Sequence, residues 1–176
     1  MKKMVVCLGL IVLLSLPAVA QVRIDMGFEI PRGIGAVVEN QNIFPQEAVD
    51  FFNTYIIPLP EAGLYYQLPI GPVRIGAGLR VFTIILANIY WPNAFVEADL
   101  GNFTLAGQIG GGLFGVFGLF PADVKTGRVF IPDLSLWYRF GNSFRVGGGA
   151  TGLLLPESDT LGYLYYIGAK FAVVFR

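Results

Sequence analysis

The stretch YLYYIGAKFAVVFR, residues 163–176, alternates between two kinds of side chain. Its odd-numbered positions are all apolar or aromatic, whereas both charged residues, Lys170 and Arg176, are even-numbered. Successive side chains of a β-strand point to opposite faces of the sheet. The pattern therefore predicts a strand with one apolar face and one face that carries the charges.

The same alternation recurs through the preceding sequence. Glycine and proline divide it into further segments of strand-like composition. The predicted strands are residues 22–30, 61–69, 73–86, 93–100, 103–117, 129–140, 143–154 and 161–176. In every strand that carries two or more charges, all of the charges fall on one face, as Arg74 and Arg80 do in the third. Each such strand is therefore predicted to separate charge from apolar surface.

The predicted connections differ in length between the two ends of the strands. Three are tight, at residues 69–72, 99–102 and 140–143, and the last two contain Gly-Asn pairs, which favour tight turns. Three others are longer, at 31–60, 118–128 and 155–160, and one near residues 90–93 is short. Short turns at one end, longer loops at the other and an even number of strands are typical of bacterial membrane barrels.

The first twenty residues have the features of a secretory signal peptide. Two lysines follow Met1, the segment from Val5 to Leu16 is apolar, and Ala18-Val19-Ala20 is a small-residue cleavage site. The alternative is an uncleaved helical anchor. We predict a signal peptide at residues 1–20 and one domain at residues 21–176, which holds no cysteine because Cys7 lies in the signal.

The two faces of the strands allow two folds. A soluble β-protein would turn its charged face to water, whereas a membrane barrel turns its apolar face to lipid and encloses the charges. The signal peptide, the aromatic residues near strand ends and the glycines on the charged face, which would leave room for long charged side chains, favour the membrane. The predicted fold is an all-β, eight-stranded, antiparallel up-and-down transmembrane β-barrel in a bacterial outer membrane.

At this point the sequence from residue 21 onward resembles the small eight-stranded outer-membrane barrels of the OmpA, OmpX and OmpW kind. The resemblance depends on the strand count, the turn and loop asymmetry and the strand 163–175, which is similar to the family's C-terminal assembly signal. The family usually ends on phenylalanine, but here Phe175 is penultimate. The resemblance implies outer-membrane lipid as surroundings, and the barrel-assembly machinery and periplasmic chaperones as partners during biogenesis.

An eight-stranded barrel has an interior that side chains can fill or that can hold one small ligand. The charges predicted to face this lumen are Arg23, Asp25, Glu29, Arg74, Arg80, Glu97, Asp99, Asp133, Arg139, Arg145 and Lys170. They are nearly balanced in sign, which favours a closed network of ion pairs. The alternative is an apolar pocket in the loop half of the lumen, formed by Tyr65, Phe82, Phe95, Phe114, Val116, Leu153 and Tyr166, which would take a lipophilic ligand as an OmpW-like barrel could.

The first loop has a pattern of its own. Between residues 45 and 57, apolar side chains recur at helical spacing, and Pro45 suits a first helical turn. We predict a short amphipathic helix that lies at the outer membrane interface or folds over the barrel mouth. Packing of an irregular loop on the rim is the alternative.

The composition argues against enzymatic chemistry. The sequence has no histidine, and hydrolases with a serine or cysteine nucleophile and most metal sites need an imidazole. We predict no catalytic residue, no metal, no cofactor and, in the absence of a basic stripe, no nucleic-acid partner. The predicted function is a structural or surface-interaction role, and the alternative is binding or passage of small lipophilic molecules.

Overall fold

The computed structural model describes residues 20–38, 41–84, 87–118, 123–155 and 160–175. Its strands are β1 (Gln21–Val38), β2 (Gln41–Asn42), β3 (Leu59–Ile70), β4 (Val73–Ile84), β5 (Ala87–Leu100), β6 (Phe103–Gly118), β7 (Asp123–Phe140), β8 (Phe144–Leu155) and β9 (Thr160–Phe175), with helix α2 (Gln46–Thr54) in the first loop. The predicted signal peptide, apart from Ala20, lies outside the described residues. In the described part of the chain, no helix has the length and apolar character needed to cross a bilayer.

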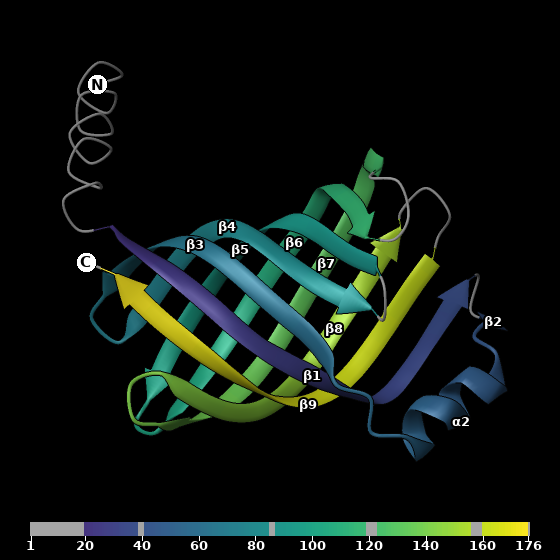
Figure 1. Ribbon diagram of the computed structural model, residues 1–176, viewed down its shortest axis with the longest axis horizontal. Helices are drawn as coiled ribbons and strands as arrows, with labels where there is room; N and C mark the ends of the chain where they lie inside the picture. The colour runs from purple at the N-terminus through teal and green to yellow at the C-terminus, as the bar shows by residue number, and fades with distance from the viewer. Residues whose placement is uncertain (1–19, 39–40, 85–86, 119–122, 156–159, 176) are drawn as a thin grey trace.

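The strands form one closed antiparallel barrel (Figure 1). Neighbours in the sequence are neighbours in the sheet from β3 to β9, β1 pairs with β3, and a further pairing of β1 with β9 closes the cylinder. The short β2 pairs only with the end of β1, which leaves eight strands in the wall. The eight-stranded up-and-down architecture is therefore confirmed.

The two ends of the barrel are built differently. Tight turns join β3 to β4, β5 to β6 and β7 to β8 at one end, and each contains a glycine with positive φ: Gly71, Gly101 and Gly141. Positive φ is unfavourable for residues that carry a Cβ, so these glycines permit the turns that the sequence predicted. Val22 of β1 pairs with Phe175 of β9 at this turn end, so the first and last strands meet there. The opposite end is the loop end.

Strands β1 and β7 are both longer than the sequence predicted. β1 was expected to stop at residue 30, before Pro31, but it continues to Val38 through a register shift between Pro31 and Gly33. The extra residue at this shift, Arg32, makes a β-bulge, and a bulge tolerates a proline that a regular ladder would exclude. Similarly, β7 begins at Asp123 instead of residue 129.

The connection predicted near residues 90–93 was wrong. Those residues lie inside β5, which begins at Ala87, and a register shift between Tyr90 and Asn93 accommodates Pro92. The neighbouring strand β6 bends at Gly111 and Gly112, which both have positive φ. Proline was taken to separate strands, whereas the bulged sheet accepts it within a strand.

The barrel has apolar side chains on its outside and charged side chains inside, the reverse of a water-soluble protein. Outward-facing side chains such as Met26, Tyr66 and Leu134 are 54%, 67% and 61% exposed, whereas the inward-facing Arg23 and Glu97 are 1% and 2% exposed. Exposed apolar side chains in water would oppose folding, but against hydrocarbon they cost nothing. The wall thus has the surface expected of a barrel surrounded by lipid.

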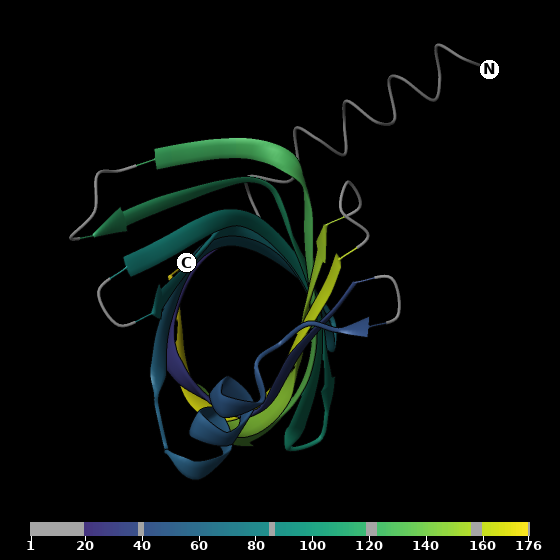
Figure 2. The same ribbon diagram turned by 90° about the vertical axis from the view of Figure 1, so that its right-hand side faces the viewer.

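The wall divides toward the loop end. The pairing of β7 with β8 extends only to Phe130 and Leu154, and that of β1 with β3 only to Glu29 and Leu59. Beyond these pairs, β8, β9 and the end of β1 continue on one side of the mouth, and β4 to β7 bend toward the other (Figure 2). The regular cylinder is therefore confined to the turn half of the molecule.

Candidate functional site

The lumen near the turn end is organised around one carboxylate. Glu97 on β5 pairs with Arg23 of β1 at 2.8 Å, Arg74 of β4 at 3.1 Å and Arg145 of β8 at 3.0 Å. The pair with Arg23 is bidentate, because Nη1 and Nη2 each donate to one carboxylate oxygen at 2.8 Å. Bidentate, charge-assisted bonds are short and fix orientation. We call these four residues the Glu97 cluster.

Two further acids attach to the Glu97 cluster. Asp25 accepts two hydrogen bonds from Arg23, each of 2.6 Å, and Asp99 pairs with Arg74 at 2.5 Å. Asp99 also forms an ion pair with Arg139 at 2.9 Å. The guanidinium of Arg139 in turn donates a hydrogen bond to the carbonyl of Gly101 in the adjacent turn. The network therefore extends from the centre of the lumen to its rim.

A second cluster has the opposite arrangement. Arg80 on β4 pairs with Glu29 at 2.6 Å, Glu61 at 2.7 Å and Asp133 at 3.5 Å. Asp133 in addition accepts hydrogen bonds from the hydroxyls of Thr151, at 2.6 Å, and Tyr166, at 2.9 Å. We call Arg80 with its three acids the Arg80 cluster.

These pairs cross the lumen. Arg23 and Glu97 belong to β1 and β5, which are three strands apart in the sheet, and the pairs Arg145–Glu97 and Arg80–Asp133 also join strands that are three apart. In a wall of eight strands that is nearly the full diameter. The side chains of both clusters therefore meet across the barrel, and we call these two sets of ion pairs cross-braces.

Lys170 lies between the two clusters in the register. Its register partner on β8 is Arg145, and its register partner on β1 is Gly27, which lies midway in sequence between Asp25 and Glu29. Its side chain is buried, and its ammonium nitrogen is 4.1 Å from the ring centre of Trp137, a cation–π distance.

Glu61 was missing from the predicted set, and among the side chains that the structure describes it completes the charge balance of the lumen. With it, six basic residues face six acidic ones: Arg23, Arg74, Arg80, Arg139, Arg145 and Lys170 against Asp25, Glu29, Glu61, Glu97, Asp99 and Asp133. The second predicted strand has this single charge, so it offered no pair of charges to compare. The parity that Glu61 shares with Tyr65 and Gln67 was the signal that would have found it.

The predicted apolar pocket residues are dispersed over several packing groups. Tyr65 and Phe95 pack edge to face, with ring centres 5.2 Å apart, and Arg23 lies 4.9 Å from the centre of the Phe95 ring. Phe82 packs instead with Leu59 and Trp91, and Tyr166 with Trp137 and Ala106.

Leu153, Val116 and Phe114 complete the predicted set. Leu153 is 40% exposed and lines a hollow of about 250 Å³ at the loop end, together with Ile131, Thr151 and Leu164. Val116 is half-buried. The side chain of Phe114 lies outside the described residues. Within the described structure, the predicted pocket thus does not appear as one enclosed chamber.

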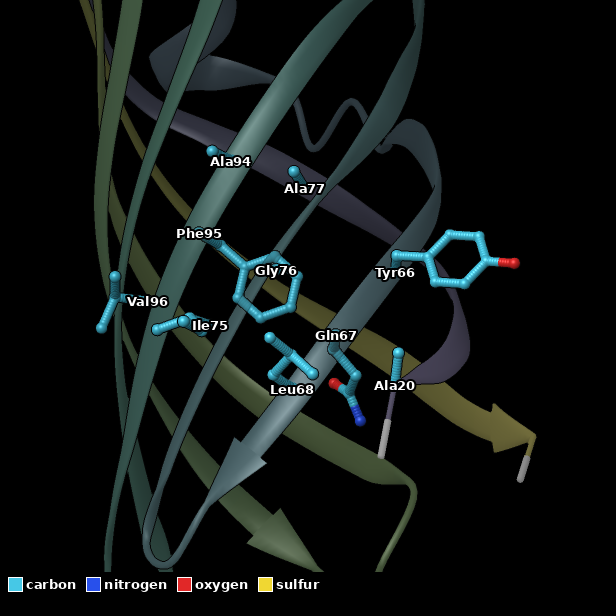
Figure 3. Close-up of a pocket in the computed structure, with 10 residues that line it drawn as sticks. All are labelled: Ala20, Tyr66, Gln67, Leu68, Ile75, Gly76, Ala77, Ala94, Phe95 and Val96. Atoms are coloured by element: carbon cyan, nitrogen blue, oxygen red, sulfur yellow. The ribbon is translucent and has the colours of Figure 1, made fainter. Parts of the chain in front are cut away.

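A larger hollow, of about 680 Å³, lies on the wall formed by β3, β4 and β5 (Figure 3). Tyr66, Ala77 and Ala94, which follow one another across the register, form its floor on the outward face. Its lining also includes Gln67, Gly76 and Phe95, and no charged residue is among the described residues that line it.

Some glycines of the inner face make room for aromatic rings. A Cβ on Gly76 would lie 2.6 Å from the ring of Phe95, and one on Gly110 would overlap the ring of Trp91. The sequence prediction assigned this space to long charged side chains. At Gly76 and Gly110 an aromatic ring takes this space instead.

Known structures are similar to this chain at the level of a small barrel. Neisserial surface protein A matches with a TM-score of 0.48 and 8% identity, over 86% of this chain and 96% of that one. The N-terminal β-barrel domain of Pseudomonas aeruginosa OprF gives 0.45 and 10%, over 88% and 99%. Ail of Yersinia pestis, in complex with the heparin analogue sucrose octasulfate, gives 0.42 and 12%, over 88% and 97%. No family model and no curated protein matches the sequence.

Proposed function

We propose that this chain is a non-enzymatic outer-membrane barrel with a closed lumen, which acts as a structural element and presents its loop end to partners outside the cell. The signal peptide at residues 1–20 and delivery by periplasmic chaperones to the barrel-assembly machinery are part of the proposal. The apolar exterior and the enclosed charges support the membrane location.

The observation that carries the closed lumen is the pair of cross-braces. Glu97 and Arg80 are 2% and 4% exposed, and each contacts three side chains of opposite charge from other strands. An ion that entered would have to displace paired charges from a narrow, poorly hydrated interior, which is costly. We therefore expect the barrel to conduct no steady ion current.

Planar-bilayer recording tests this expectation. The wild-type protein should give no stable single-channel currents, whereas a triple variant, Arg23→Ala with Glu97→Ala and Arg145→Ala, should conduct because it removes the side chains that cross the lumen. Leu134→Ala, on the exterior wall, is the matched control and should remain silent. Heat-modifiable gel migration establishes that each variant is a folded barrel.

The outcome for the wild-type protein is decisive even if the triple variant does not fold. Stable currents through unmodified protein of proven heat-modifiable migration would contradict a closed lumen. Recovery of the folded protein in a water-soluble fraction, without detergent, would contradict the membrane location.

A further inference from the structure

Helix α2 carries more apolar surface than the barrel covers. Ala48, Val49 and Phe52 are half-buried, whereas Phe51 and Tyr55 are 49% and 56% exposed. At 100° per residue these five side chains share one continuous arc of the helix. The polar residues Gln46, Glu47, Asp50, Asn53 and Thr54 occupy the remaining arc. One part of the apolar arc thus packs on protein, and an adjoining part has no cover among the described residues.

The level of the helix along the barrel axis is fixed by the two ends of its loop. The amide of Ile43 donates to the carbonyl of Ala36 at 2.9 Å, and Leu59 is the register partner of Glu29. Both anchors are on β1, and Arg32 lies midway between them. Figure 1 shows α2 beside this part of β1, at the loop end of the barrel. The helix is therefore held near the level of Arg32.

Arg32 interrupts the apolar outward face of β1. Among the strand residues whose side chains the structure describes, it is the charged residue that is exposed, and the other charged ones are buried or half-buried in the lumen. The outward face of β1 is apolar from Val22 to Ile30. The ten steps from Val22 to Arg32, at about 3.3 Å each and tilted by about 40°, rise by about 25 Å, which is the height of the apolar band of such barrels.

From these positions we infer that α2 is an interfacial helix, which lies at the boundary between the headgroups and acyl chains of the outer leaflet. Phe51 and Tyr55 enter the lipid beside β1, Ala48, Val49 and Phe52 rest on the barrel, and the polar arc faces water. The helix would fix the depth of the barrel in the membrane and hold the first loop flat. The inference rests on the proposed membrane location.

Single-cysteine labelling tests the inference in the full chain, in a Cys7→Ser background. An environment-sensitive fluorophore is attached at Phe51→Cys or Tyr55→Cys, and at Asp50→Cys or Asn53→Cys as matched controls on the polar arc; all four positions are exposed. The protein is reconstituted in phosphatidylcholine vesicles that contain lipid spin-labelled near the headgroup. We expect several-fold stronger quenching by the lipid at residues 51 and 55, and several-fold stronger quenching by aqueous iodide at residues 50 and 53.

A label at Leu134→Cys, in the middle of the wall, separates the inference from its premise. If lipid quenches residue 134 but the two arcs of α2 respond alike to iodide, the interfacial helix is overturned and the barrel location is retained. If lipid quenches none of the five positions in heat-modifiable protein, the membrane location itself is overturned.

Discussion

The two charge clusters of the lumen are opposites. In the Glu97 cluster one carboxylate is shared by three guanidinium groups, and in the Arg80 cluster one guanidinium is shared by three carboxylates. The first lies toward the turn end and carries an excess of positive charge; the second lies toward the loop end and carries an excess of negative charge. Their difference teaches that the described charges of the lumen balance only when both clusters are counted together, since neither cluster is neutral alone.

The largest effect should come from removing the shared carboxylate. Glu97→Gln leaves three arginines facing one another with Asp25 and Asp99 as their remaining acids, and arginine cannot lose its charge. Breaking a buried ion network strands the partner charges, and we expect a loss of about 4 kcal/mol in the free energy of unfolding. Urea titration of the protein in vesicles measures it. Glu47→Gln, on the exposed helix, is the control and should change nothing; an equal effect of the two would refute the central role of Glu97.

The Arg80 cluster should respond to pH where the Glu97 cluster does not. Arg80→Met strands Glu29, Glu61 and Asp133, at a cost of about 3 kcal/mol at pH 8. Stranded carboxylates can take up protons that the unfolded chain would not hold at the same pH, so the folded variant binds more protons and its stability relative to wild type rises as pH falls.

Unfolding midpoints of the two variants between pH 8 and pH 5 provide the comparison. The deficit of Arg80→Met should shrink on acidification, and that of Glu97→Gln should not. If the stability loss of Arg80→Met is constant across this range, the prediction is wrong. The repulsion among the three acids would then be reduced in another way, for example by water that enters the lumen.

The smallest effect should come from the rim. The side chain of Arg139 is 27% exposed and shares Asp99 with Arg74 and Thr104, so Arg139→Gln leaves that carboxylate with two donors. Partly hydrated pairs contribute little, and we expect a loss below about 1 kcal/mol that disappears in high salt. The same urea titration at two salt concentrations measures it. A loss as large as that of Glu97→Gln would mean that the rim, too, is closed to water.

Much of the barrel could be predicted from the sequence because its information is local. Side-chain parity identified which residues of each strand face the lumen, and Gly101 and Gly141 identified tight turns, since both signals depend on a few consecutive residues. The amphipathic helix was predicted at residues 45–57 and extends over Gln46–Thr54. Predictions went wrong where a bulge keeps a proline within a strand, as at Pro31 and Pro92, because tolerance of the proline depends on the partner strand.

The sequence by itself determined that each strand has a charged and an apolar face, and so which residues could enter a common interior. Only the tertiary structure decided which charges meet. Arg23 reaches Glu97 because closure of the cylinder brings β1 opposite β5. The register of β1, β3 and β4 places Glu29 and Glu61 beside Arg80, and Asp133 reaches the same guanidinium from β7 across the lumen. A pattern of period two fixes the face of a side chain, but its partner across the lumen follows from strand number and register, which no single strand encodes.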